Sequence, residues 1–129
     1  IPFLGVCVGL QLLSKKSEEG KKKGLDWINA TTIRFSFSGH ALRIPHMGWN
    51  TIDIRQKSLL YNQLPDDARF YFVHSYHLVC QDPKDIISTT NYGYDFVSGI
   101  QRGNVYGVQY HPEKSHKFGM RLYANFLKI

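Results

Sequence analysis

The sequence predicts an α/β fold, and three observations support that prediction. An apolar run over residues 1–8 turns at a glycine into a helical pattern, which indicates a strand, a tight turn and a short helix. From residue 31 onward, short segments rich in β-branched and aromatic residues are separated by Gly, Asn and Pro, as successive strands are. Residues 119–129 place Met, Leu, Tyr and Phe at helical spacing, which predicts a closing amphipathic helix.

The individual elements can be placed in chain order. Residues 1–8 predict the first strand, and the pattern LQLLSKKSEEG predicts a short helix that ends near Gly20. A short turn of helix is expected at 58–64 and a hairpin turn at 101–104. The strand-like segments lie at 31–39, 41–54, 69–80, 85–93, 94–103 and 104–111.

Length and composition predict one globular domain over residues 1–129, because 43% hydrophobic residues are enough to build a core. With two cysteines, no signal-peptide pattern and no long apolar run, we expect a cytoplasmic protein without a membrane span. A strand that leads into a tight turn of this kind is normally a central strand of its sheet. We therefore expect the 129 residues to be the C-terminal portion of a longer chain.

The formal charge of +6 comes partly from Lys15, Lys16 and the run 21–23, in a loop that also contains acidic residues. Aromatic residues are not interleaved with these lysines, as a stacking platform for nucleic acid requires. We therefore expect a solvated loop and no nucleic-acid partner. Attraction of a phosphorylated substrate or an acidic partner remains open.

Cys7 lies between Gly5 and Gly9 at the predicted turn from strand to helix. A nucleophile on a strained turn needs small neighbours, whereas a buried structural cysteine does not. The start of the following helix places partial positive charge near the sulfur and offers the backbone N–H groups of Val8 and Gly9 to an oxyanion. Gln11, one turn into the helix, is placed to bind a substrate amide. Cys80, which follows apolar residues, is interpreted as a core residue.

The segment VYGVQYHPEKS provides a base and a group to orient it. His111 ends an alternating strand, Pro112 stops the strand, and Glu113 follows two residues after the histidine. Glu113 can accept the imidazole N–H that faces away from the sulfur. The sequence therefore predicts a catalytic triad of Cys7, His111 and Glu113.

A metal site is not favoured by the six histidines. His74 and His77 are three residues apart in a predicted strand, which places them on opposite faces. We expect neither a metal nor another cofactor.

The motifs GVCVGLQLL and YHPEKS, in this order and about a hundred residues apart, resemble the G-x-C-x-G elbow and the distant H-P-E of class I glutamine amidotransferases. SEEG, PHMGWN and FYFVHSYH resemble one branch of that family, the glutaminase subunits of imidazole glycerol phosphate synthases. The similarity covers essentially the whole chain. It implies the flavodoxin-like three-layer sandwich of class I glutamine amidotransferases, here without its N-terminal strands and helices and without the glycine-rich segment that contributes to the oxyanion hole.

The resemblance also implies an activity and a partner. Cys7 would hydrolyse L-glutamine through a thioester, and ammonia would pass to a (β/α)8-barrel synthase (cyclase) subunit in histidine biosynthesis, within a heterodimer. Gln11, His74, Ser75 and Tyr76 match substrate-binding positions. The positions that match the face toward the synthase are Pro45, Met47, Trp49, Asn50, Tyr71 and Lys114. The alternative for Met47 and Trp49 is core packing, although Gly48 and Asn50 are expected to make a turn that leaves an aromatic residue exposed.

Three other functions are consistent with the same residues. Relatives of this branch supply ammonia to partners that amidinate bacterial surface sugars. A cysteine hydrolase of the α/β type would take its acid from between the nucleophile and the histidine, where Asp66, Asp67, Asp82 and Asp85 occur. A noncatalytic binding module is the third, which the intact triad disfavours.

Overall fold

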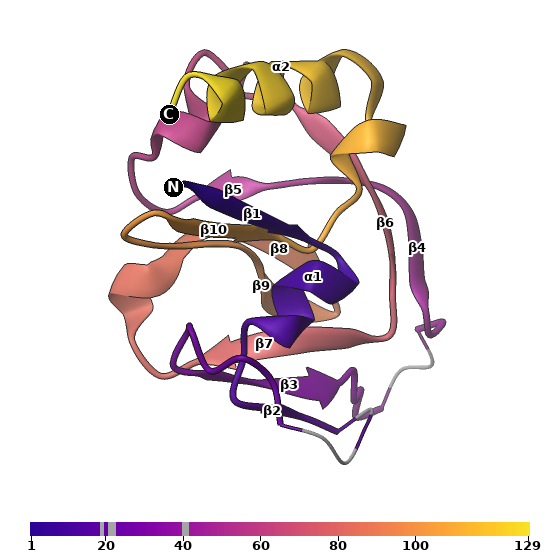
Figure 1. Ribbon diagram of the computed structural model, residues 1–129. Helices are drawn as coiled ribbons and strands as arrows, with labels where there is room; N and C mark the ends of the chain where they lie inside the picture. The colour runs from indigo at the N-terminus through magenta and orange to yellow at the C-terminus, as the bar shows by residue number, and fades with distance from the viewer. Residues whose placement is uncertain (19, 21–22, 40–41) are drawn as a thin grey trace.

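The computed structural model describes residues 1–18, 20, 23–39 and 42–129, and within them it forms a strongly curled mixed sheet with a helix on either face (Figure 1). The strands are β1 (Phe3–Val6), β2 (Lys16–Ser17), β3 (Ala30–Arg34), β4 (His46–Thr51), β5 (Asp53–Ile54), β6 (Arg69–His74), β7 (Tyr76–Cys80), β8 (Ile86–Tyr92), β9 (Tyr94–Arg102) and β10 (Val105–Val108). The α-helices are α1 (Val8–Leu12) and α2 (His116–Leu127), and the 3-10 turns are η1 (Leu59–Tyr61), η2 (Pro83–Asp85) and η3 (Pro112–Lys114).

The topology brings the start and the end of the described chain together. The larger sheet has the order β1-β10-β9-β7-β3-β2, with β8 beside β9 and β5 beside β8, while β4 and β6 form a separate antiparallel pair. β1 runs parallel to β10 (Figure 1). Because the carboxyl ends of parallel strands meet at one edge of a sheet, Cys7 after β1 and the residues after β10 lie at the same edge.

The two α-helices cover opposite faces of this part of the sheet. Leu10 of α1 is fully buried, and a Cβ added at Gly107 of β10 would lie 2.5 Å from its side chain. Within the described residues the core has two hydrophobic clusters, and Leu10 belongs to one of them. Tyr106 and Val108, which flank Gly107, belong to the second, together with Leu122 of α2. Alternation along β10 therefore gives each helix its own face, and the predicted α/β class is confirmed.

The first helix is shorter than the sequence predicted. It ends at Leu12 instead of near Gly20, because the carbonyls of Leu12 and Leu13 accept backbone N–H groups from residues 25, 27 and 28. The buried Ser14 hydroxyl also lies 2.9 Å from the Thr32 hydroxyl, which directs the chain into β2 and β3. Tertiary hydrogen bonds thus replace the next helical turn.

Other predicted elements are confirmed with changed boundaries. The segment 69–80 is two strands, β6 and β7, divided at Ser75. The hairpin turn between β9 and β10 is confirmed, and α2 begins at His116, three residues before the predicted start. Part of the predicted basic loop, residues 21 and 22, lies outside the described residues. No helix in the part of the chain that the structure describes combines the length and the apolar character needed to cross a bilayer.

Candidate active site

Cys7 occupies a strained turn between β1 and α1. Its φ of 53° and ψ of −106° lie outside the regions that ordinary residues prefer. Gly5 is required for this turn, because a Cβ there would lie 2.7 Å from the Gly9 carbonyl oxygen. A Cβ at Gly9, by contrast, would meet no atom of the described residues within 4 Å. The predicted elbow is confirmed in shape, and the space beside Gly9 is open.

The thiol of Cys7 lies against β6 and against Gln109. Its sulfur is 3.9 Å from the Val73 carbonyl oxygen of β6 and 3.9 Å from Nε2 of Gln109, the residue after β10. The Cys7 amide donates to the Val108 carbonyl oxygen at 2.9 Å, which anchors the turn to the end of β10. Gln109 is fully buried, and its Oε1 has no hydrogen-bond partner among the residues that the structure describes. A buried amide therefore faces the sulfur with its donor end.

His111 and Glu113 are in contact, as the sequence predicted. Nδ1 of His111 lies 3.1 Å from Oε1 and 3.2 Å from Oε2 of the Glu113 carboxylate. A carboxylate only accepts, so Nδ1 carries the proton and Nε2 is left to act as a base. Within the described residues, Glu113 is the carboxylate that contacts this imidazole. Asp85, one of the alternative acids, is buried in η2, beside Asp82.

The backbone holds His111 against the same strand that contacts the thiol. The amide of His111 donates to the Tyr71 carbonyl oxygen at 2.9 Å. The Ser115 hydroxyl donates to the His111 carbonyl oxygen at 2.6 Å and accepts from the Tyr71 amide at 2.9 Å. Tyr71 and Val73 are two residues apart on β6, so their carbonyl groups point to the same side of the strand. β6 thus contacts both Cys7 and His111, which are 104 positions apart in the sequence.

The predicted substrate-binding residues meet beside this site. Nε2 of Gln11 donates to the Tyr76 carbonyl oxygen at 3.3 Å, and Nδ1 of His74 lies 2.8 Å from the same oxygen. Gln11 and His74 are buried, with 8% and 5% of their surfaces exposed. Ser75 contributes its backbone, since its carbonyl oxygen accepts from the Phe35 amide at 3.0 Å.

The expectation that His74 and His77 lie on opposite faces is wrong. Both rings pack on Phe35, with centroid distances of 5.1 and 4.8 Å, because the strand breaks at Ser75. Burial lowers the pKa of His74 to about 3 and that of His46 to about 4, so both are neutral at pH 7. Among the described residues, no group of three His, Cys, Asp or Glu side chains is placed to hold a metal.

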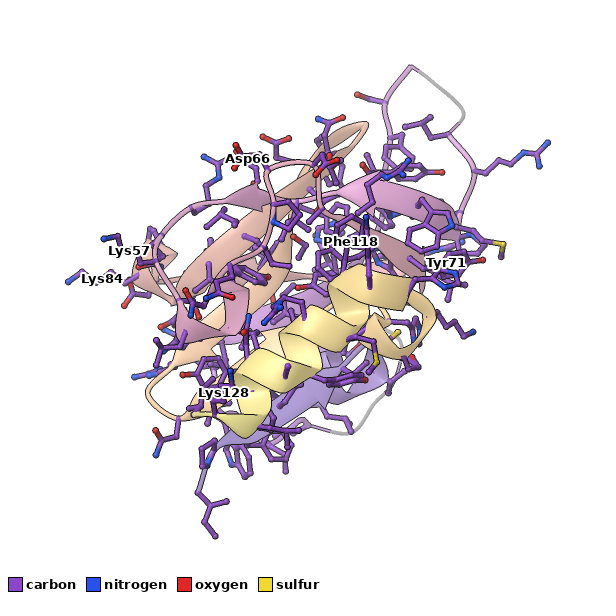
Figure 2. The ribbon with its side chains drawn as sticks, turned by 90° about the horizontal axis from the view of Figure 1, so that it is seen from above. Lys57, Asp66, Tyr71, Lys84, Phe118 and Lys128 are labelled. Atoms are coloured by element: carbon purple, nitrogen blue, oxygen red, sulfur yellow. The ribbon has the colours of Figure 1, made fainter. Side chains whose placement is uncertain are left out.

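The residues predicted to face a partner cluster on β4, β6 and η3. Met47 and Trp49 are 62% and 45% exposed, which excludes core packing. The Trp49 ring meets the Tyr71 ring edge-on at 6.0 Å, and the Lys114 ammonium lies 6.0 Å from the centre of the Tyr71 ring. Figure 2 shows Tyr71 beside the start of α2, where its amide donates to the Ser115 hydroxyl. The expected turn at Gly48 and Asn50 is wrong, because residues 46–51 form β4, paired with β6. Pro45, half-buried, directly precedes this strand.

Three residues of this region were missed from the sequence. Gln109 faces the Cys7 sulfur, His46 hydrogen-bonds His74, and His116 stacks on Trp49 at 5.5 Å. Trp49 and His116 line a groove of about 380 Å³ with Arg69, Ser115, Lys117 and Phe118. Gln109 was recognisable from its place two residues before His111, since alternation turns it to the same side. The contacts of His46 and His116 join separate segments, and no local pattern indicates them.

Comparison with protein families places the whole chain in one model, that of the class I glutamine amidotransferases, which matches residues 1–129. An imidazole glycerol phosphate synthase subunit, HisH 2 of Methanococcus maripaludis, is 52% identical over 98% of this chain. The HisH subunit of Leptospira borgpetersenii is 47% identical over 100% of it. The chain spans 62% and 64% of the lengths of these two proteins.

Solved structures confirm the fold. A protein described as a GMP synthase subunit, from Thermoplasma acidophilum, superimposes with a TM-score of 0.72 over 98% of this chain and 56% of its own, at 20% identity. A glutamine amidotransferase from Thermotoga maritima gives a TM-score of 0.64 over 99% of this chain and 47% of its own, also at 20% identity. At this identity the likeness concerns the fold alone.

Proposed function

The chain belongs to the class I glutamine amidotransferase family, and from this premise we propose that it hydrolyses L-glutamine to glutamate and ammonia. The observation that carries the proposal is the contact of His111 with Glu113 at 3.1 Å, beside the strand that also contacts the Cys7 thiol. A nucleophile, a base and a group that orients the base are the parts that cysteine catalysis requires.

The proposed reaction uses Cys7, His111 and Glu113 in turn. Nε2 of His111 takes the thiol proton, and the Cys7 sulfur attacks the carboxamide carbon of glutamine. When the C–N bond breaks, His111 returns that proton to the leaving nitrogen, so ammonia departs and a γ-glutamyl thioester remains. His111 then deprotonates a water molecule that attacks the thioester, which releases glutamate and restores the thiol. Glu113 fixes the imidazole tautomer throughout.

Val8 and Gly9 are proposed to bind the oxyanion. They are the first two residues of α1, and backbone N–H groups in the first turn of a helix have no partner within the helix. The space beside Gly9 supports this role, because a Cβ there would meet no atom of the described residues within 4 Å and the space is open to a ligand. Gln11, His74, Ser75 and Tyr76 are proposed to line the pocket for the glutamine substrate.

The partner is proposed to be a (β/α)8-barrel synthase subunit that uses the ammonia in histidine biosynthesis, within a cytoplasmic heterodimer. The names of the two HisH relatives favour this pathway over the amidination of surface sugars. The proposed contact face comprises Pro45, Met47, Trp49, Asn50, Tyr71 and Lys114. Exposed aromatic and thioether side chains beside a cation are typical of such interfaces.

The test uses the full-length protein purified with its partner. Cys7→Ala is expected to abolish glutamine-dependent turnover of the complex and to leave turnover with free ammonia intact. Cys80→Ala is the matched control, because burial raises the pKa of the Cys80 thiol to about 12 and keeps it protonated. Loss of both activities in Cys7→Ala would mean that Cys7 is structural, and glutamine-dependent turnover by that variant would reject the proposed nucleophile.

A further inference from the structure

Two histidines form a hydrogen bond inside an aromatic cluster, and one of them, His74, belongs to the proposed substrate pocket. Nδ1 of His46 lies 3.0 Å from Nε2 of His74, and the two residues are 3% and 5% exposed. The surrounding rings are Phe35, Phe72, Tyr92 and Phe96. Burying polar rings among apolar ones is costly unless their hydrogen bonds are satisfied, so the way this pair is satisfied is informative.

The contacts determine which nitrogen of each ring carries the proton. The Tyr76 carbonyl oxygen only accepts, so Nδ1 of His74 must donate to it across 2.8 Å. Nε2 of the neutral His74 is then an acceptor, and Nδ1 of His46 must donate to it. Nε2 of His46 is left as an acceptor and lies 3.3 Å from the amide nitrogen of Asn50. The hydrogen bonds therefore run in one direction, from Asn50 to the Tyr76 carbonyl.

The Tyr76 carbonyl also receives the side chain of Gln11. Nε2 of Gln11 donates to it at 3.3 Å. This bond uses one of the two N–H donors of the Gln11 amide and turns Nε2 toward Tyr76, so Oε1, the acceptor, lies on the other side of the amide. An acceptor is the group that a substrate ammonium or amide N–H requires. The series of hydrogen bonds thus turns Oε1 of the Gln11 amide toward the substrate.

The other end of this series of hydrogen bonds, at Asn50, lies on the proposed partner face. Asn50 is half-buried on β4, the strand that also carries the exposed Met47 and Trp49. Its amide nitrogen is held by a second bond, to the Asn91 carbonyl oxygen at 2.9 Å. The hydrogen-bonded path therefore connects β4 with α1 through two buried rings, both kept neutral by burial.

We propose that His46 and His74 are positioning residues that hold the Gln11 amide in its substrate-binding orientation through the Tyr76 carbonyl, with Asn50 as the outer end of the chain. The inference rests on the proposed function, since it assumes that Gln11 binds the glutamine substrate. Removing the hydrogen bond between His46 and His74 leaves Cys7, His111 and Glu113 in place. Glutamine binding should therefore weaken while the chemical step continues.

The kinetic test compares two buried histidines of one aromatic cluster in the full-length protein with its partner. His46→Phe fills the space without a donor, and we expect KM for glutamine to rise about five- to tenfold, as loss of one hydrogen bond predicts, with kcat within about twofold. His77→Phe is the control, because the His77 ring hydrogen-bonds Tyr94 and the Leu78 carbonyl oxygen and, within the described residues, makes no hydrogen bond to His46, His74 or the Tyr76 carbonyl. His46→Gln, which keeps a donor, should restore part of the affinity.

The outcomes separate this inference from the proposed function. A wild-type complex that releases no glutamate rejects the proposed function. An active wild type whose KM is unchanged in His46→Phe, or changed equally in His77→Phe, rejects the positioning role.

A second measurement needs no variant and remains decisive where His46→Phe does not fold. In the ¹⁵N NMR spectrum of the wild type, an N–H···N bond should give a coupling between Nδ1 of His46 and Nε2 of His74, with the proton on Nδ1 in both rings. His77, bonded to oxygen atoms, should show no such coupling. Protons on Nε2 of His46 or His74, or no coupling between the pair, would reject the proposed series of hydrogen bonds.

Discussion

Gln109 places its side-chain nitrogen 3.9 Å from the sulfur of Cys7, although the two residues are 102 positions apart in the sequence. The pairing depends on the parallel register of β1 with β10, which aligns Val6 with Val108 and ends both strands at the same edge. A buried amide donor next to a thiol stabilises the thiolate, the form that attacks carbon.

Replacing Gln109 with methionine is therefore expected to slow alkylation of Cys7 by iodoacetamide about five- to tenfold, as loss of one hydrogen bond to sulfur predicts. The rate is measured in a Cys80→Ala background, so that Cys7 alone reports. Gln101→Met, which removes an amide remote from the thiol, should leave the rate unchanged. Equal rates in all three proteins would show that the Gln109 amide does not act on the sulfur.

Glu113→Gln should lower kcat/KM for glutamine on the order of a hundredfold, because an amide carries no charge to stabilise the imidazolium and can present an N–H to Nδ1 of His111, which favours the wrong tautomer. Asp85→Asn should stay within about twofold of the wild type, since Asp85 lies in η2, away from His111. Steady-state assays of both variants with the partner decide the point. A larger loss in Asp85→Asn would favour a hydrolase that takes its acid from the middle of the chain.

Trp49→Ala is expected to weaken binding of the partner at least tenfold, as truncation of a central aromatic contact usually does. Trp27→Ala provides a matched control, because both tryptophans are 45% exposed and Trp27 packs on Phe3 at the opposite end of β1 from Cys7. Isothermal titration calorimetry gives both dissociation constants. Similar losses in the two variants would remove β4 from the proposed interface.

Gly5→Ala should destabilise the protein by about 2 kcal/mol, because the added Cβ would lie 2.7 Å from the backbone of α1. Gly9→Ala should leave the free energy of unfolding within about 1 kcal/mol of the wild type, since its Cβ meets open space in a helix. Urea denaturation of the two variants measures the difference. If Gly5→Ala were as stable as Gly9→Ala, the close approach of β1 to α1 would be wrong.

Acid should destabilise the fold through His46 and His74. Their pKa values are lowered to about 4 and about 3, so between these values and the usual 6.5 the unfolded chain binds protons that the folded chain does not. This part of the stability is complete above about pH 6.5 and is lost as the pH falls. For His46 the total loss is on the order of 3 kcal/mol.

Urea unfolding of the wild type and of His46→Phe at pH 7 and pH 4.5 tests this. The variant lacks one of the two groups and should lose less stability between the two values. An identical loss in both proteins would show that His46 does not contribute.

The patterns that are local in sequence were predictable. The apolar run, the glycines around Cys7 and the two-residue spacing of His111 and Glu113 are short-range features, and the structure contains the elbow and the contact that they predict. The end of α1 was not predictable from its pattern, because distant backbone groups replace the hydrogen bonds of its next turn. The break at Ser75 was likewise hidden within a continuous run of strand-forming residues.

The sequence by itself determined the α/β class, the family and the residues proposed to perform the chemistry, since these depend on residue type and short spacing. Only the tertiary structure decided that β6 joins Cys7 to His111, that Gln109 faces the sulfur, and that His46 and His74 bond each other. Those contacts depend on strand register and on the breaks between strands. Register is set by the simultaneous burial of many side chains, and no single segment encodes it.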